Sequence, residues 1–416
     1  MKKLLIQCQL SNYDDDGNYI LNCDSGFNMN VGRAKEMLKL NKDLKIDFLV
    51  SDYNQTKHQP AYLVRDILDM NRVKFIRQHL TNHAIKTRYD FHYNELEFLL
   101  NESNYTHLYL NDPCLVGNYK TLFYKSYNKS PKIISHNHFV DLPENPKVPL
   151  ETSYYFRQIE GAIKADINLF QCESAMNEFF DSISKTLSPT LVDIIKSKSE
   201  PYDDGYSYEE INKPIIENEL RFKLPADKVI IFVPNRIGRT FDYTNCGKFL
   251  FEFVNDLYKE RQDFVIVAGN PSQKISNEEL AKSVKPYVYL VKDTFSRNEY
   301  RYVARNSDIV IGLYDKDLYG ATALRECLDL SCLPLLLDIN EYKKIMDAAD
   351  YPFRVKSDFS NLNSQLSSLI HFVKEQRYEN DSMTKHKDYF NFKDIIRKRC
   401  SFEYTTQRAM QRMDLL

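Results

Sequence analysis

The sequence lacks most of the features that assign a protein to a class at sight. It has no tryptophan, only 11 glycines among 416 residues, and no apolar run near the ~20 residues that cross a bilayer. The eight cysteines include no CxxC pair, so neither a zinc site nor a disulfide framework is predicted, and reduced thiols in a cytosol are expected. No GxxxxGK[ST] is present and no GxGxxG follows the first predicted strand, which removes the main signals for a P-loop or a dinucleotide site.

The composition and charge are those of a soluble globular protein. Hydrophobic residues make up 43% of the chain and charged residues 27%. The formal net charge of −2 argues against a broad electrostatic clamp on nucleic acid but not against a local basic groove. The first residues, MKKLLIQCQL, turn polar too early for a signal peptide and are predicted to form the first strand.

Short apolar runs rich in β-branched residues alternate with segments of helical periodicity along the whole chain. This alternation predicts the α/β class with parallel sheets. The predicted strands lie at 2–9, 45–51, 73–76, 107–110, 132–135, 166–171, 228–233, 263–268, 287–292, 308–313 and 333–338.

The alternation is interrupted once, by a polar stretch rich in lysine, glutamate and proline. The sequence therefore predicts two domains joined by a linker and followed by a helical tail that returns to the first domain. Their ranges are 1–190 for the first domain, 191–222 for the linker, 223–390 for the second domain and 391–416 for the tail.

The stretch PNRIGRT, Pro234 to Thr240, follows the predicted strand 228–233. Loops at the carboxyl ends of parallel strands are where α/β sheets bind ligands. The forked guanidinium groups of Arg236 and Arg239 suit the paired oxygens of a diphosphate. We therefore interpret both arginines as diphosphate ligands; the alternative is that one or both are simply solvated.

A second candidate site lies in YGATALREC, where Gly320 and Thr322 are predicted to begin a helix. The free N–H groups of a helix start can hold an anion. Glu326, about one turn further on, could accept hydrogen bonds from sugar hydroxyls. The alternative is an ordinary glutamate favoured by the helix dipole.

A third candidate is the cluster His136-Asn137-His138, directly after the predicted strand 132–135. Histidines at a strand end can bind a substrate or carry a proton. Loop-capping histidines are the alternative interpretation. A metal site is not predicted, because no third histidine or cysteine stands nearby in the sequence.

Together these segments resemble retaining glycosyltransferases of the GT-B architecture, which has two facing Rossmann-like domains and a C-terminal crossover helix. The similarity is carried by IIFVPNRIGRT, FVIVAGNP, SDIVIGLYDKDLYGATALREC and SCLPLLLD, in that order, and more thinly by GAIKADINLFQCESAMNEFF in the first half. The resemblance implies that Arg236 or Arg239 binds the donor diphosphate and that Glu326 contacts the ribose. The family lysine has no clean match, and Lys248 after Gly247 is the substitute; Leu318 stands where the family has a further glutamate.

A narrower resemblance is to the DNA α-glucosyltransferases of T-even bacteriophages. It rests on NRIGRT, on the histidine cluster, and on the spacing of Glu326 before Pro334. Those enzymes have an aspartate between the histidines where this chain has Asn137, which cannot act as a base. Retaining transfer can instead use the departing phosphate as the base.

The resemblance implies a transferase that moves a hexosyl or pentosyl group from a nucleoside diphosphate sugar. The expected donor is a UDP-sugar, and no tightly bound cofactor is expected. His136, His138 and Arg239 are the expected catalytic residues. The acceptor would be a hydroxymethylated base in double-stranded DNA. The protein itself is expected in the cytoplasm, or in the host cytoplasm if the protein is viral. Alternatives are a polysaccharide, lipid-linked glycan or protein acceptor, a sugar-nucleotide epimerase, and a catalytically silent binding module. The sequence does not set the oligomeric state.

Overall fold

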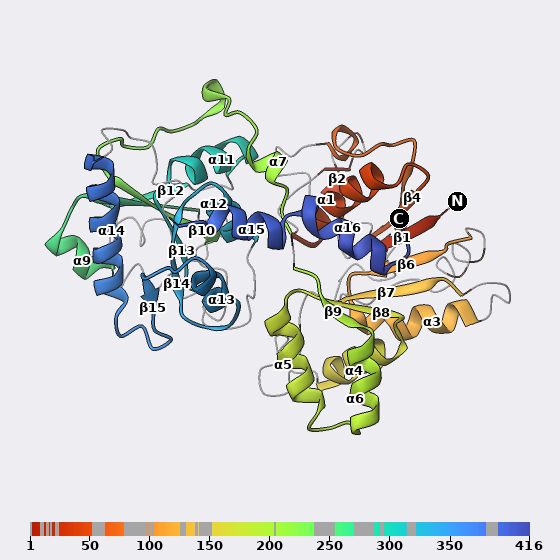
Figure 1. Cartoon of the computed structure of the whole chain (residues 1–416). Helices are drawn as coiled ribbons and strands as arrows, with labels where there is room; N and C mark the ends of the chain where they lie inside the picture. The colour runs from red at the N-terminus through yellow and green to blue at the C-terminus, as the bar shows by residue number, and fades with distance from the viewer. Residues whose placement is uncertain are drawn as a thin grey trace. The chain divides into compact units, whose positions relative to one another are not determined.

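The fold is described from a computed structural model of the whole chain (Figure 1). The residues that it describes are 2–8, 12–13, 16, 19–20, 25–51, 63–78, 97, 101, 104–124, 130–137, 140, 152–203, 205–236, 254–269, 287–291, 295–313, 322–379 and 390–416. The chain divides into two compact units, residues 1–205 with 402–416, and residues 206–401.

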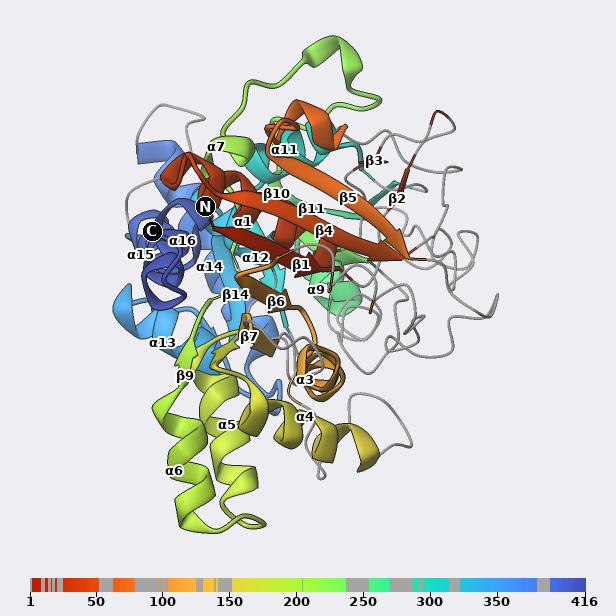
Figure 2. The ribbon, with the colours of Figure 1, turned by 90° about the vertical axis from the view of Figure 1, so that its right-hand side faces the viewer.

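The first unit is built on a seven-stranded parallel sheet, in the order β5-β4-β1-β6-β7-β8-β9. Figure 2 shows β5, β4, β1, β6 and β7 following one another in this order. The strands are β1 (Lys3–Gln7), β4 (Lys45–Ser51), β5 (Val73–Gln78), β6 (His107–Leu110), β7 (Lys132–Asn137), β8 (Ile167–Phe170) and β9 (Ser199–Pro201). A separate antiparallel pair joins β2 (Asn12–Tyr13) and β3 (Tyr19–Ile20).

Both faces of this sheet are covered and apolar, as in most parallel sheets. Successive side chains of a strand point to opposite faces, so neighbouring residues of β1 pack in different layers. Leu4 and Ile6 pack on one face with residues of α1 (Ser25–Leu40) and the C-terminal helix α16 (Phe402–Arg412). Leu5 packs on the other face with residues of the short helix η3 (Pro113–Leu115) and of α3 (Val116–Tyr124). The unit also contains η2 (Val64–Asp66), α4 (Thr152–Lys164), α5 (Glu173–Ile183) and α6 (Pro189–Ser197).

The second unit has a six-stranded parallel sheet, in the order β12-β11-β10-β13-β14-β15, with one apolar core. Its strands are β10 (Val229–Arg236), β11 (Phe264–Gly269), β12 (Val288–Val291), β13 (Ile309–Gly312), β14 (Leu333–Leu337) and β15 (Arg354–Val355). Its described helices are α7 (Tyr208–Ile211), η4 (Glu217–Glu219), α9 (Asn255–Glu260), α11 (Arg297–Asn306), α12 (Thr322–Asp329), α13 (Asn340–Ala348), α14 (Leu362–Glu379) and α15 (Phe392–Cys400). The predicted α/β class with parallel sheets is confirmed.

The polar stretch 191–222, expected as a linker, contains regular structure in both units. Its first part completes α6 and adds β9 to the first sheet. Its last part is attached to α11, where the Asn298 side chain both accepts from the Ile216 N–H at 3.0 Å and donates to its carbonyl at 2.8 Å. Arg221 adds two hydrogen bonds to Glu299, at 2.6 and 2.8 Å.

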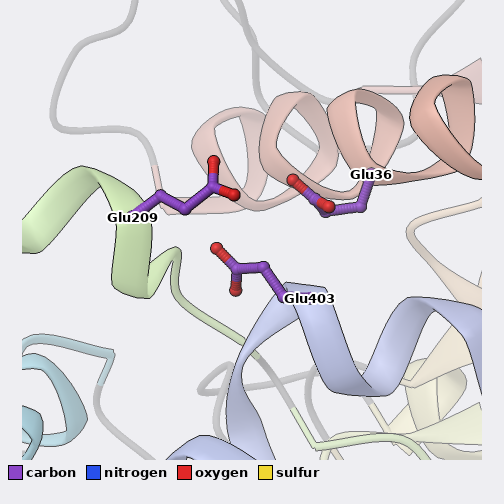
Figure 3. Close-up of side chains that lie close together, drawn as sticks. All are labelled: Glu36, Glu209 and Glu403. Atoms are coloured by element: carbon purple, nitrogen blue, oxygen red, sulfur yellow. The ribbon is translucent and has the colours of Figure 1, made fainter.

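The chain returns to the first unit at Phe402, and α16 packs on α1. Gly32 of α1 makes this close approach possible, since a Cβ there would lie 2.3 Å from the Phe402 ring. Figure 3 shows Glu36 of α1 and Glu403 of α16, whose carboxylate oxygens lie within 4.8 Å of each other. The Lys39 ammonium, 2.8 Å from Glu36, offsets part of their repulsion.

The end of the chain is tied to the amino-terminal edge of the same sheet. The Lys2 ammonium donates to the Leu416 carbonyl at 2.6 Å, and Lys132 pairs with Asp414 at 2.7 Å. Both ends of the chain thus belong to the first unit (Figure 1). None of the described helices is long and apolar enough to span a bilayer.

Two helical glycines of the first unit give a matched test of how α4 packs against η3 and α3. A Cβ at Gly161 of α4 would lie 2.0 Å from the Pro113 carbonyl oxygen, whereas the atom nearest to one at Gly117 of α3 would be a carboxylate oxygen at the end of the long Glu160 side chain, at 3.0 Å. Gly161→Ala should therefore destabilise the unit by ~1–3 kcal/mol through overpacking. Gly117→Ala should be neutral or up to ~1 kcal/mol stabilising, because alanine favours helix. Urea unfolding measures both; equal effects of the two changes would contradict the packing described here.

Candidate functional site

The strand order of the second unit locates a site before any side chain is considered. The chain runs from β10 outward to β11 and β12, and then returns to place β13 on the other side of β10. The carboxyl ends of β10 and β13 therefore border the point at which the order reverses, where open α/β sheets bind their ligands. β10 ends at Arg236, and α12 is the first described element after β13.

Two of the predicted donor residues, Arg236 and Thr322, lie in the described elements that follow this edge, at the end of β10 and at the start of α12. Arg236 closes β10, its backbone paired with Gly269 after an irregularity in the strand, but its side chain is outside the described structure. Arg239, Lys248 and Gly320 also lie outside the described residues. Thr322 is the first residue of α12, as the predicted helix start requires.

Glu326 is not a solvated first-turn glutamate. It is the fifth residue of α12, it is 5% exposed, and it is paired with Arg297 of α11. One guanidinium nitrogen, Nη1, donates to Oε2 at 3.1 Å, and the other, Nη2, donates to Oε1 at 2.5 Å. A carboxylate this buried needs such a partner, since leaving it uncompensated would be costly. The pair holds the acid as an oriented acceptor in the middle of the helix.

Arg297 is itself held firmly. It is the first residue of α11, whose preceding residue Ser296 forms a reciprocal capping box with Glu299. The Tyr300 ring lies 5.2 Å from the guanidinium carbon, and the Tyr300 hydroxyl donates to the carbonyl of Ala323 in α12 at 2.9 Å. These contacts join the first turns of α11 and α12.

The charges in this cluster are strongly coupled. Burial alone would lower the pKa of the Arg297 guanidinium, but Glu326 raises it above its ordinary value, so the arginine stays charged. Burial, with nearby Cys327 and Glu326, raises the pKa of the Tyr300 hydroxyl, which stays protonated. Burial would raise the pKa of Glu299, but hydrogen bonds from Arg221 and Ser296 lower it. The cluster therefore contains two ion pairs, Arg297–Glu326 and Arg221–Glu299, and the neutral phenol of Tyr300.

The other end of α12 is fixed by a second buried carboxylate. Asp329 is 1% exposed, accepts from Arg397 of α15, and accepts from the Asn212 amide at 2.9 Å. Burial would lower the pKa of Arg397, but its bond to Asp329 raises it. The site helix is thus held by two arginines from other helices, Arg297 at its middle and Arg397 at its end.

In the first unit, the strand order reverses between β1 and β6, and the histidine cluster lies one strand further, at the end of β7. His136 is fully buried: its Nδ1 lies 3.2 Å from Asn111 Oδ1, and its ring lies between those of Tyr109 and Tyr202, at 5.8 and 6.3 Å. The guanidinium of buried Arg33 donates to the Tyr109 hydroxyl at 2.7 Å and lies 4.6 Å from the Tyr202 ring. His138 lies outside the described residues.

The Asn137 side chain is held by hydrogen bonds within the first unit. Its amide nitrogen donates to the Leu169 carbonyl of β8, and its amide oxygen accepts from Gln158 of α4, both at 3.2 Å. The residue is fully buried. The amide thus ties β7 to its neighbouring strand and helix, a task that needs both a donor and an acceptor and that an ionised aspartate could not perform.

Sequence reasoning missed Arg297, Tyr300 and Arg397. None of them stands in a motif, and each acts on α12 from a distant part of the chain; Arg297 and Glu326 are 29 residues apart. The one available signal was indirect: buried acids in the helix 322–329 would require basic partners.

Comparison with known proteins gives the fold. No family model matches the chain, and no curated protein matches it by sequence. Among solved structures, a trehalose-6-phosphate synthase matches at 12% identity and a TM-score of 0.66, covering 100% of this chain and 99% of its own. HepE of Anabaena in complex with UDP-glucose matches at 10% identity and 0.65, covering 100% of both chains. The sucrose-phosphate synthase of Thermosynechococcus elongatus matches at 11% identity and a TM-score of 0.64, and the match covers 99% of this chain and 98% of that one. The chain therefore has the GT-B fold, with two Rossmann-like units, as the sequence predicted.

The Asp329–Arg397 pair can be tested by stability. Arg397→Met should lower the free energy of unfolding by ~3 kcal/mol, because it leaves a buried carboxylate without its cation. Lys259→Met, which removes an exposed pair with Asp256 at 2.7 Å, should cost less than ~1 kcal/mol. Urea unfolding followed by tyrosine fluorescence compares the two. Finding both variants equally stable would show that Asp329 does not depend on Arg397.

Proposed function

We propose that this chain is a glycosyltransferase that takes a sugar from a UDP-sugar and transfers it with retention of configuration. The observation that carries the proposal is the GT-B fold over the full length of the chain, shared with structures named as sugar-phosphate synthases and with HepE bound to UDP-glucose. The oriented carboxylate of Glu326, on the helix where the sequence pattern expects the ribose contact, supports the same reaction class.

In this proposal the second unit binds the donor. Arg236, Arg239 and Lys248 neutralise the charge that grows on the diphosphate as the glycosidic bond breaks, and the N–H groups near Gly320 and Thr322 add to this. Glu326 accepts the ribose hydroxyls. The diphosphate contacts rest on the sequence pattern, and the ribose contact rests also on the geometry of the Glu326 pair.

The first unit then binds the acceptor. His138 is the better candidate for touching the donor sugar or the acceptor hydroxyl, because His136 is enclosed by Tyr109 and Tyr202. His136 would fix the end of β7 from which His138 follows. Asn137 needs no catalytic role, since the departing phosphate can take the acceptor proton.

The acceptor class proposed from the sequence resemblance is a hydroxymethylated base in double-stranded DNA, which must leave the base stack to react. The tail arginines, which could have formed a DNA-binding strip, are engaged within the protein: Arg397 binds Asp329, Arg399 binds Glu341, and Arg408 donates to the Pro201 carbonyl. Gel-shift titration of hydroxymethylated duplex DNA at rising salt tests this acceptor. Binding that weakens steeply with salt supports it, and absence of binding favours a polysaccharide, lipid-linked glycan or protein.

The competing function is a silent GT-B module that binds a ligand without turnover. Two features favour it: Leu318, which stands in place of the first glutamate of the family pattern, and Asn137 between the two histidines. Slow release of UDP from a UDP-sugar by the purified chain would exclude this alternative.

Nucleotide binding is the first expected result. UDP or its sugar conjugate at ~100 times its dissociation constant should add ~2.7 kcal/mol to the stability of the folded chain. Thermal unfolding against a panel of nucleoside diphosphates and their sugars measures it, with uridine as the control that lacks the diphosphate. If a well-folded sample responds to no member of the panel, the donor site is wrongly assigned.

Arg239 is expected to matter for turnover. Losing one pre-organised donor costs ~3–4 kcal/mol of transition-state stabilisation, so Arg239→Ala should reduce turnover at least ~100-fold. Arg354→Met, which removes an arginine paired with Asp347 in the same unit, should leave turnover unchanged. UDP release from a UDP-sugar provides the assay. A rate for Arg239→Ala within about threefold of wild type would refute the role of Arg239.

A further inference from the structure

We propose that Arg297 is a positioning residue that lets the donor site distinguish ribose from deoxyribose. The inference rests on the proposed function, in which Glu326 accepts the ribose hydroxyls. Arg297 would touch the nucleotide only through Glu326, and its contribution would be the orientation of that carboxylate.

The geometry of the pair fixes the carboxylate in two respects. Each Oε atom of Glu326 accepts from a different terminal nitrogen of the same guanidinium, at 3.1 and 2.5 Å. Because a guanidinium is a rigid plane, this two-point contact sets both the position of the carboxylate and the rotation of its plane. A lysine could set the position but not the rotation.

Arg297 is restrained on its own side. Its backbone opens α11 next to the Ser296 capping box, and its guanidinium lies over the Tyr300 ring. The Tyr300 hydroxyl also bonds to α12 at Ala323, one turn before Glu326. The acid and the base that orients it are thus fixed to the same pair of helices, and neither can shift without breaking contacts.

Enough acceptor capacity remains for a sugar. A carboxylate has about four lone-pair directions, and Arg297 uses two. A ribose offers two neighbouring hydroxyl donors, whereas 2′-deoxyribose offers one. Only a carboxylate of fixed rotation can receive both hydroxyls at good angles, so discrimination depends on the fork of Arg297 as well as on the charge of Glu326.

The experiment compares the affinities of UDP and 2′-deoxy-UDP by titration calorimetry. A hydrogen bond to a charged group predicts that the wild-type chain binds UDP about tenfold more tightly or better. Arg297→Met should reduce this preference to about threefold or less, and Arg297→Lys should give an intermediate value. Arg305→Met is the matched control: Arg305 lies on the same helix but donates to the carbonyls of Ile211 and Lys213, so the preference should stay at the wild-type value.

The outcomes separate the inference from its premise. If the wild-type chain binds neither nucleotide, the proposed function fails and the inference fails with it. If it binds UDP selectively and both Arg297 variants keep the full preference, the proposed function stands and the positioning role is refuted. Loss of preference in Arg297→Met or Arg297→Lys, with the Arg305→Met control unchanged, supports the role. Because Arg297→Lys keeps the charge beside Glu326, it decides the question even if Arg297→Met does not fold.

Discussion

The pairing of buried carboxylates with arginines from distant segments is the interaction on which the second unit depends. Asp329 is almost completely buried at the end of α12, where its carboxylate is paired with Arg397 of α15 and accepts from the Asn212 amide. Arg399, two residues later, reaches buried Glu341 of α13 in the same way. The last residues of this unit are therefore part of its core, and α15 holds α12 and α13 together.

Much of the fold could be predicted because buried parallel strands are nearly continuous apolar runs. Strands such as β10 and β11 stand out against the polar composition of the rest of the chain. The stretch 191–222 did not stand out, because its elements are short and its buried side chains are scattered. They are Val192, Ile195, Tyr202, Asp203, Tyr206 and Ile211. A segment that binds through side-chain hydrogen bonds, as 216–224 does to α11, has the composition of a linker.

In the candidate site, too, features with a local sequence pattern could be predicted and contacts between distant segments could not. The helix that begins at Thr322 and carries Glu326 could be predicted, because a helix start has a local sequence pattern. Arg297 could not, since an ion pair between two helices leaves no pattern at either residue. At Asn137 the sequence showed only that the aspartate of the phage enzymes is absent, and the structure adds what the amide does: it joins β7 to β8 and α4. Motif reasoning identifies which residues could act, but burial and partners decide which ones are committed elsewhere.

A carboxylate that is oriented before any ligand arrives has a consequence for binding. The free energy spent on burying and aligning Glu326 is compensated within the folded protein, by Arg297 and by the cap and the tyrosine that hold Arg297. In the proposed function, a sugar that meets this carboxylate does not have to order it, so less of the interaction is lost to side-chain entropy. The same arrangement limits the site, because a fixed acceptor serves one geometry of hydroxyl groups well and others poorly. The selectivity proposed for this site and its pre-organisation therefore have one structural cause, the rigid two-point contact between the acid and the arginine.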